Sequence, residues 1–366
     1  MEQEGYAAYL MRNTSDIAWV TAFDAVFDEE QAHALLVTAD GAWLHTDSRY
    51  VSACRAAAGD GPVSVEDDRT SHTEWAAVRL SKDAAVSDFR ARRSEDAWLA
   101  VEDSITVREY RGLLEACAAV GLDKSAVCLV RDFGTALRAV KDELEISRCA
   151  AAQTITDQTY AYICGYIKPG MTERQIQLAM DAKMMELGAD GLAFPTIVAA
   201  GAHAASPHAQ PGDAIIASGD AIVMDFGAKK GGYCSDMTRT VFVGEPDEEL
   251  RRAYECIRRA NETVEAWLTA GKSARQAHDM AEQILEEDGF GGAMGHSLGH
   301  GVGLDIHELP VLSPRTDEVL QPGNIVTVEP GIYLPGRFGM RLEDFGVIEE
   351  CGFHVLTQSS HDMVII

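Results

Sequence analysis

The sequence lacks long apolar runs. None of its apolar stretches approaches the roughly 20 residues that a membrane-spanning helix needs. The acidic residues 1–5 are followed by no apolar segment of the kind found in secretory signals. We therefore expect a cytoplasmic protein that neither crosses nor enters a membrane.

Paired cysteines are also missing. The eight cysteines are scattered, and no two of them form a Cys-x-x-Cys pair. In a chain of 366 residues this distribution indicates reduced, mostly buried thiols and argues against a disulfide framework. Cys234 lies two residues before Asp236, and we expect it to pack inward from a strand and not to bind metal.

Positive charge is scarce. Lysines and arginines number 31 against 58 aspartates and glutamates, which gives a formal net charge of −27. Nucleic acids and anionic membranes bind basic surfaces, so neither is an expected partner. The acidity itself has two explanations: it keeps the protein soluble, or part of it surrounds cations.

Length and pattern divide the chain into two domains. Its 366 residues exceed what one ordinary core holds. Residues 1–142 contain strand-like runs at 33–38 and 42–46, joined by a hairpin turn and followed by an alanine-rich helix, which indicates an α/β domain. A charged junction marks the expected boundary, and residues 143–366 form the second domain.

The second domain contains an internal repeat. Residues 170–188 match residues 271–289, and each copy follows a long helix-like segment, about 143–168 and 247–269. Each copy begins at a capped helix start and is followed by two strand-like segments with two acidic residues. This repetition predicts a pseudo-symmetric α+β fold whose two halves face one site.

The first acidic pair is Asp225, near the end of an apolar strand-like run, and Asp236 on the following one. If Lys230-Gly231 forms a two-residue loop, these aspartates lie directly opposite each other, with Cβ atoms ~4.5–5.5 Å apart. Two buried carboxylates so close repel, so they require a shared proton, a basic partner or a divalent cation. The alternative is another register that leaves one aspartate exposed.

The second half repeats this acidic pattern. An apolar run at 325–328 ends in Glu329, and Glu343 lies on the returning segment. Four carboxylates on facing strands could neutralise two divalent cations, which makes the alternative of one exposed aspartate less favourable.

Three of the 11 histidines, His296, His300 and His307, lie within one glycine-rich stretch. Glycine lets the backbone and neighbouring side chains approach a ligand closely. The stretch has neither the His-Glu-x-x-His helix of zinc peptidases nor the strand–loop–helix unit of a dinucleotide site. A mostly oxygen-donor site with one imidazole suits manganese, cobalt or iron, and zinc less selectively.

Together these segments resemble the pita-bread metallopeptidases: aminopeptidase P, prolidase (Xaa-Pro dipeptidase) and, more distantly, methionine aminopeptidase. The matching strings, in order and spacing, are residues 222–227, 235–240, 295–310, 327–333 and 340–344. The resemblance implies an α+β pita-bread fold with pseudo-two-fold symmetry for residues 143–366. Residues 1–142 resemble the creatinase-type N-terminal domain of the proline-specific branch.

The resemblance also implies a site for two divalent metal ions, with manganese expected first and cobalt, zinc or iron as alternatives. Asp236 and Glu343 would bridge the two ions, and Asp225 would complete the shell of one. His300 and Glu329 would complete the shell of the other. Glu329 would also accept a proton from the bridging water that attacks the carbonyl carbon before proline.

Four further residues match substrate-side positions of the family. His208 lies upstream of the first aspartate, and His296 and His307 flank the metal-binding histidine. Arg341, beside the final glutamate, would balance charge or contact substrate.

Two positions depart from the family pattern. His203 stands where a small polar residue such as Asn is expected, and Phe345 stands where another acid is common. Neither departure removes a metal ligand, but both could alter the range of substrates.

The expected function is hydrolysis of the Xaa-Pro bond in dipeptides or short peptides by a homodimer. Three alternatives remain. A creatinase-like enzyme is disfavoured because that branch has lost the metal ligands, and a non-enzymatic binding protein should show decayed ligands. A hydrolase of another small amide would keep them, so only a substrate assay separates it.

Overall fold

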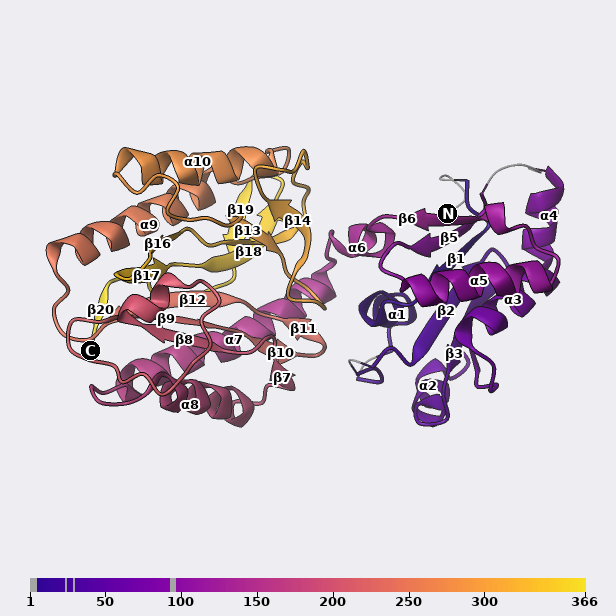
Figure 1. Ribbon diagram of the computed structural model, residues 1–366, viewed down its shortest axis with the longest axis horizontal. Coiled ribbons are helices and arrows are strands. Elements are labelled where there is room, and N and C mark those ends of the chain that lie inside the picture. Colours follow the sequence, from indigo (N-terminus) through magenta and orange to yellow (C-terminus); the bar gives the residue numbers. More distant parts are fainter. Residues whose placement is uncertain (1–4, 24, 29, 93–96) are drawn as a thin grey trace. The chain divides into compact units, whose positions relative to one another are not determined.

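The computed structural model divides into two compact units, Met1–Arg138 and Ala139–Ile366 (Figure 1). The structure describes residues 5–23, 25–28, 30–92 and 97–366. Among these residues, no helix is both long enough and apolar enough to cross a membrane. The domain boundary expected after residue 142 stays a prediction.

The first unit is built on one mixed sheet with the strand order β4-β3-β2-β1-β5-β6. Its strands are β1 (Ala8–Met11), β2 (His33–Thr38), β3 (Gly41–Thr46), β4 (Val63–Glu66), β5 (Leu99–Glu102) and β6 (Val127–Val130). The strands expected at 33–38 and 42–46 are confirmed as β2 and β3, an antiparallel hairpin whose ladder closes at Thr38 and Gly41.

Helices pack on this sheet because both of its faces are apolar. Successive residues of β1 belong to different core clusters: Leu10 packs with Trp75 and Leu113, whereas Tyr9 packs with Ile17. This alternation follows from the two-residue period of a strand. The helices are α1 (Thr14–Thr21), α2 (Val51–Ala58), α3 (His72–Lys82), α4 (Ala84–Arg92), α5 (Val107–Ala119) and α6 (Phe133–Arg138).

The second unit repeats one plan, a long helix followed by a shorter one. The first pair is α7 (Glu143–Tyr166) and α8 (Glu173–Glu186), and the second is α9 (Glu248–Trp267) and α10 (Ala274–Glu287). Within this unit the two helix pairs lie on opposite sides of the strands (Figure 1). The helices expected from the sequence repeat are therefore confirmed.

Similar local chemistry starts both shorter helices. The Thr172 hydroxyl accepts a hydrogen bond from the Gln175 backbone N–H, and the Gln175 side chain accepts one from the Thr172 N–H. Ser273 caps α10 by accepting from the backbone N–H three residues later. Both helices end before a glycine with positive φ, Gly188 at 92° and Gly289 at 82°. Such caps satisfy backbone groups that a helix end leaves unpaired.

The strands of the first half form a four-stranded sheet, β20-β12-β9-β8, and a three-stranded one, β11-β10-β7. Their bounds are β7 (Gly191–Leu192), β8 (Ile197–Ala200), β9 (Ala221–Phe226), β10 (Ala228–Lys230), β11 (Tyr233–Cys234), β12 (Met237–Phe242) and β20 (Val364–Ile365). Ile222 and Met224 of β9 pack with Ile176 and Met180 of α8 in one core cluster.

The strands of the second half form a five-stranded sheet, β14-β13-β15-β18-β19, and the hairpin β16-β17. Their bounds are β13 (Gly299–Gly301), β14 (Glu308–Leu312), β15 (Ile325–Val328), β16 (Gly331–Leu334), β17 (Phe338–Arg341), β18 (Asp344–Glu349) and β19 (Gly352–Val355). Val326 and Val328 pack with Ile257 of α9 and Leu285 of α10 in a second cluster. Each half thus packs around a cluster of its own, and a further cluster that includes Tyr233 of the first half and Val302 of the second joins the halves.

Replacing Thr172 with Ala should lower the free energy of unfolding by about 1 kcal/mol, because the substitution removes the N-cap of α8. The midpoint of urea denaturation measures this effect. The matched control is Thr154→Ala, the same change at an exposed position inside α7, where alanine favours the helix. Equal midpoints for the two variants would contradict the capping role.

Candidate metal centre

The first acidic pair lies on a hairpin whose register differs from the expected one. β9 pairs with β12 so that Asp225 faces Thr238 and not Asp236. The loop consists of Gly231 and Gly232, one residue later than expected, and both have positive φ. The expectation that the aspartates lie directly opposite each other is therefore wrong. Because the register differs by two residues, both aspartates still belong to the same face.

The second acidic pair lies in a gap between two ladders. The ladder of β15 and β18 stops beside Glu329 and Glu343, and the ladder of β16 and β17 continues beyond them in the same register. The Glu343 N–H donates instead to the carbonyl of Thr238 in the first half, over 3.1 Å, and the Glu329 N–H donates to Leu298. The Glu343 backbone is thereby held against the first half, and the Glu329 backbone against another segment of the second half.

His300 lies on β13, which two glycines allow to approach its neighbours closely. A Cβ atom at Gly299 would lie 2.0 Å from the carbonyl oxygen of Thr327, and one at Gly301 would lie 2.3 Å from that of Leu309. The His300 backbone N–H donates to the Thr327 hydroxyl. Its Nδ1 lies 3.0 Å from the Gly301 carbonyl, which assigns the proton to Nδ1 and leaves the lone pair of Nε2 for a ligand.

The expected ligands converge. Donor atoms of Asp236, His300 and Glu343 lie within 4.8 Å of one another. The Nε2 atom of His300 is 3.6 Å from a carboxylate oxygen of Asp236 and 3.4 Å from one of Glu329. Burial, reinforced by the neighbouring carboxylates, raises the pKa of Asp236, Glu329 and Glu343. Burial lowers the pKa of His300 and so favours its neutral form. The cluster is therefore rich in acidic groups and short of positive charge.

Asp225 has a basic partner. The buried Arg341 guanidinium donates to Asp225 Oδ2, to the Tyr333 hydroxyl over 2.6 Å, and to the Thr238 hydroxyl over 2.9 Å. Burial alone would lower the pKa of Arg341, but Tyr333 and the carboxylates hold it well above its usual value. The side chain of Arg341 thus balances charge, one of the two roles expected for it.

The residues present fit divalent cations. Asp225 uses one oxygen for Arg341, whereas its Oδ1 is buried and has no hydrogen-bond partner. The lone pair of His300 Nε2 faces carboxylate oxygens of Asp236 and Glu329 to which it has no proton to donate. A positive charge among these atoms would satisfy all of them. An oxygen-rich donor set with one imidazole suits a divalent metal ion.

Three other imidazoles flank the cluster. The Nε2 atom of His296 lies 3.2 Å from the Tyr333 hydroxyl. The ring of His307 packs edge-on against that of His300, with centroids 4.4 Å apart. Burial lowers the pKa of His296 and His307, and the nearby His208 lowers both further. His208 itself is exposed, and its expected role at the substrate stays a prediction.

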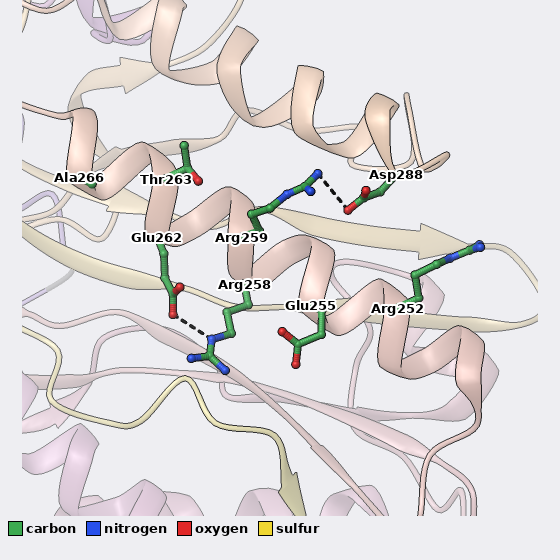
Figure 2. Close-up of a pocket in the computed structure, with 8 residues that line it drawn as sticks. All are labelled: Arg252, Glu255, Arg258, Arg259, Glu262, Thr263, Ala266 and Asp288. Carbon is green, nitrogen blue, oxygen red and sulfur yellow. Dashed lines mark hydrogen bonds and ion pairs between the residues drawn. The ribbon is translucent and has the colours of Figure 1, made fainter.

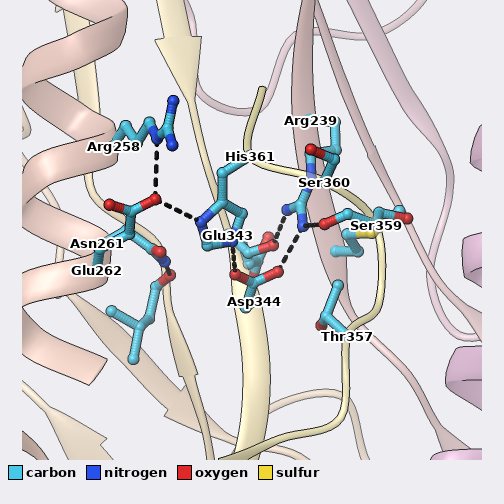
Figure 3. Close-up of polar contacts among 12 residues, drawn as sticks. Arg239, Arg258, Asn261, Glu262, Glu343, Asp344, Thr357, Ser359, Ser360 and His361 are labelled. Atoms are coloured by element: carbon cyan, nitrogen blue, oxygen red, sulfur yellow. Dashed lines mark hydrogen bonds and ion pairs between the residues drawn. The ribbon is translucent and has the colours of Figure 1, made fainter. Parts of the chain in front are cut away.

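A second polar network supports the chain that carries Glu343 (Figure 3). The fully buried Arg239 of β12 donates to the Glu343 carbonyl over 2.5 Å and to Asp344 Oδ1 over 2.6 Å. His361 contacts the other oxygen of Asp344 and, through its second ring nitrogen, Glu262. The network therefore fixes the position of the Glu343 backbone.

Asp344 and His361 also form, with Glu265, a second group of potential metal ligands. Burial alone would raise the pKa of Asp344, but Arg239 and His361 lower it. Burial and Asp344 raise the pKa of Glu265 to about 9. An arginine and a retained proton therefore supply the positive charge here, and the group has no need of a cation.

A hollow on the outer face of α9 is lined mostly by charged side chains (Figure 2). Its lining residues are Arg252, Glu255, Arg258, Arg259, Glu262, Thr263, Ala266 and Asp288. Arg258 pairs with Glu262 and Arg259 pairs with Asp288, so charges are largely matched within the hollow. Such exposed pairs contribute only about 0–1 kcal/mol each. The lining includes none of the residues expected from the sequence to bind metal or substrate.

Sequence reasoning missed three polar residues of the centre: Tyr333, Thr238 and Thr327. The Thr238 hydroxyl donates to Glu343 over 2.6 Å, and the Thr327 hydroxyl donates to Glu329 over 3.1 Å. Each threonine lies two positions from an acidic residue along its strand, so period-two alternation could have found both. No comparable spacing marks the hydroxyl of Tyr333.

The duplicated halves around a carboxylate–imidazole cluster, preceded by an α/β unit, define a pita-bread metallopeptidase with a creatinase-like N-terminal domain. Residues 147–350 match the family described as "Metallopeptidase family M24", and residues 1–131 match "Creatinase/Prolidase N-terminal domain". The chain belongs to metallopeptidase family M24. Membership makes it a peptidase that uses divalent metal ions, and the resemblance inferred from the sequence is confirmed.

Named relatives agree with this assignment. "Uncharacterized peptidase YqhT" of Bacillus subtilis is 31% identical over 365 residues, which cover 100% of this chain and 97% of that protein. The solved structure titled "Xaa-Pro dipeptidase from Bacillus anthracis" is 31% identical, with a TM-score of 0.87 over 100% of this chain and 96% of that one. "Prolidase from Pyrococcus furiosus" has a TM-score of 0.84 at 28% identity, over 98% of both chains.

Adding Mn²⁺ to the metal-free protein at neutral pH is expected to release protons. Because burial raises the pKa of Asp236, Glu329 and Glu343, protons compete with a cation for these carboxyls, and a bound cation displaces them. The apparent affinity should accordingly rise with pH. Titration calorimetry in two buffers of different ionisation enthalpy counts the protons released.

The Glu343→Gln variant should release fewer protons and bind Mn²⁺ more weakly than the unaltered protein. The exposed Glu350, near the end of the same sheet, provides the matched control Glu350→Gln, which should titrate like the unaltered protein. Identical heats in both buffers for the unaltered protein would contradict the retained protons.

Proposed function

We propose that this protein hydrolyses the Xaa-Pro bond of dipeptides or short peptides with two divalent cations. The proposed ligands are Asp225, Asp236, His300, Glu329 and Glu343. The observation that carries the proposal is the convergence of acidic and imidazole donors within 4.8 Å, in a chain whose relatives include proteins named Xaa-Pro dipeptidase.

Divalent cations, when bound, supply a water of lowered pKa and polarise the substrate carbonyl. The chain's own residues prepare the rest. Thr327 donates to Glu329, which orients this carboxylate to accept a proton from the attacking water. His300 keeps its proton on Nδ1, so Nε2 stays available to the cluster. Glu329 therefore acts in the proposal both as ligand and as general base.

Arg341 and Tyr333 shape the opposite side of the centre. Arg341 stays charged and neutralises Asp225, so the substrate does not have to supply a positive charge for that carboxylate. Burial and neighbouring carboxylates raise the pKa of Tyr333 to about 12, so its hydroxyl keeps its proton at neutral pH. The exposed His208 would donate to a developing oxyanion. Nδ1 of His296 faces the Ser297 carbonyl, so the imidazole proton is used there, and its Nε2 accepts from the Tyr333 hydroxyl.

The proposed substrate differs from an ordinary peptide at the bond that is cut. Proline has no amide hydrogen, and the bond before it is a tertiary amide. A site for this bond must accept a rigid ring behind the carbonyl and recognise the carbonyl oxygen or a nearby carboxylate instead. The imidazoles of His208, His296 and His307 are suited to both of these groups.

We further propose manganese as the native metal, with cobalt, zinc or iron as alternatives, and a cytoplasmic homodimer as the working form. The mostly oxygen-donor set supports manganese, and the family resemblance supports the dimer and the location. The competing function is hydrolysis of another small amide on the same metal centre, which would use the same ligands.

A panel of peptides separates the two functions. With Mn²⁺ or Co²⁺, Ala-Pro, Leu-Pro or a short Xaa-Pro-Yaa peptide should be cleaved at least about tenfold faster than Met-Ala, since discrimination of this size is within reach of a shaped pocket. Product analysis by liquid chromatography gives kcat/KM for each peptide. Equal rates on Met-Ala, or no cleavage of any proline peptide, would overturn the substrate assignment and leave the fold unaffected.

Replacing Glu329 with Gln should remove nearly all turnover, because the change deletes both a charged ligand and the proposed base. Circular dichroism should still report the native fold. His208→Ala and His307→Ala should lower kcat/KM while metal analysis shows unchanged metal content. Glu350→Gln, an exposed change of the same kind, should leave kcat/KM unchanged. Activity of Glu329→Gln at the unaltered rate would refute the proposed mechanism.

A further inference from the structure

His208 lies on a segment whose two ends contact the same buried carboxylate, that of Glu173, in addition to the backbone hydrogen bonds that these ends make. Oε1 of Glu173 accepts from the backbone N–H of Ala200, over 2.9 Å, at the start of the segment. Oε2 accepts from the backbone N–H of Gly212, over 3.1 Å, at its end. The Nδ1 atom of His203 lies 2.8 and 3.0 Å from the same two oxygens. One side chain therefore holds the segment at both ends and in between.

The charge of Glu173 is stabilised although its side chain is fully buried. Glu173 is the first residue of α8, directly after the N-cap Thr172, where the helix dipole favours a negative charge. The two backbone N–H groups and the imidazole supply hydrogen bonds that replace those of water. Buried carboxylates with several donors of this kind hold their partners in a defined geometry.

The anchored segment reaches the proposed metal centre. Its helical turn, Gly201–Ala205, contacts β17, the strand that ends in Arg341. The approach is so close that a Cβ atom at Gly339 would lie 1.8 Å from the Ala204 carbonyl oxygen. Beyond this turn the chain exposes His208, which lies near His296 and His307.

From this geometry we propose that Glu173 and His203 are positioning residues, which hold His208 where it meets the substrate. His203 is one of the two residues that depart from the family pattern, and its contact with Glu173 adds a side-chain anchor to the two backbone ones. The role in catalysis rests on the proposed function, but the anchoring itself does not.

The anchoring is tested without substrate. In Glu173→Gln the side chain keeps only one accepting oxygen. Its NH₂ group then faces the backbone N–H of Ala200 or of Gly212, and that hydrogen bond is lost. Amide hydrogen exchange in residues 200–212 of the metal-loaded protein should become at least about tenfold faster, as expected for a segment that opens locally. Glu186→Gln, in the last turn of the same helix, replaces an exposed carboxylate and should leave this exchange unchanged.

His203→Ala is a second variant for the case that Glu173→Gln fails to fold. His203 is 41% exposed, so this change removes one anchor without opening a cavity in the core. Exchange in residues 200–212 should again accelerate, by less than in Glu173→Gln. Unchanged exchange in both variants, or in His203→Ala alone if the other does not fold, would overturn the anchoring.

A double-mutant cycle tests the role in catalysis. Glu173→Gln should lower kcat on a cleaved Xaa-Pro peptide by roughly tenfold to a hundredfold, with unchanged metal content, because misplacement of about 1 Å has effects of this size. Combined with His208→Ala, it should be no slower than His208→Ala alone. Losses that multiply would show that Glu173 does not act through His208. If the unaltered protein cleaves no proline peptide, the proposed function fails, and the exchange experiment still decides the anchoring.

Discussion

Four carboxylates, three of them buried and that of Glu329 partly buried, are gathered around one small volume, and the second unit depends on this constraint. Asp225, Asp236, Glu329 and Glu343 repel one another, and burial removes the water that would screen them. Within the described part of the chain, Arg341 pairs with Asp225 and lies 4.0 Å from Glu329, and the neutral imidazole of His300 adds no charge. The remaining charge has to be balanced by protons or cations. Such a site is stable only when the surrounding structure holds the acids in place.

Hydrogen bonds from neighbouring backbone and side chains hold these acids in place. Each acid lies near a strand end or in a gap between ladders, and the backbone N–H of Glu343 donates to Thr238 of the other half. Thr238 and Thr327 donate to the carboxylates, and Arg239 fixes the backbone of Glu343 from the opposite side. Glycines on both sides of His300 let the imidazole enter a space that a larger neighbour would close. Packing and hydrogen bonding therefore hold together carboxylates that their like charges would otherwise drive apart.

Much of this arrangement is predictable from the sequence because it is encoded locally. Apolar runs that end in an acid marked Asp225 and Glu329, the capping box of Thr172 marked a helix start, and the repeat offset predicted two similar halves. The register was missed by two residues because consecutive glycines made the turn fall at Gly231 and Gly232, which a local pattern leaves open. Loop position, not strand content, was the source of the error.

Contacts between distant residues were not predictable. Arg341 and Asp225 are 116 residues apart, and nothing in either local pattern names the other as its partner. Glu173 looked like an ordinary residue of a helix first turn, and only the folded chain brings residues 200 and 212 to its carboxylate. A single sequence carries no periodic signal for such pairs, since they depend on how the elements pack.

The division of the ligands between the two halves has a mechanical consequence. Asp225 and Asp236 come from the first half, and His300 and Glu343 come from the second. Cations shared by these side chains would act as a removable cross-link between the halves. Withdrawal of the metal would then loosen the contacts around the site, whereas the apolar cluster shared by the halves, which includes Tyr233 and Val302, would still hold them together. A substitution in the apolar core of one half would weaken metal binding only if it moved the ligands of that half relative to the ligands of the other half.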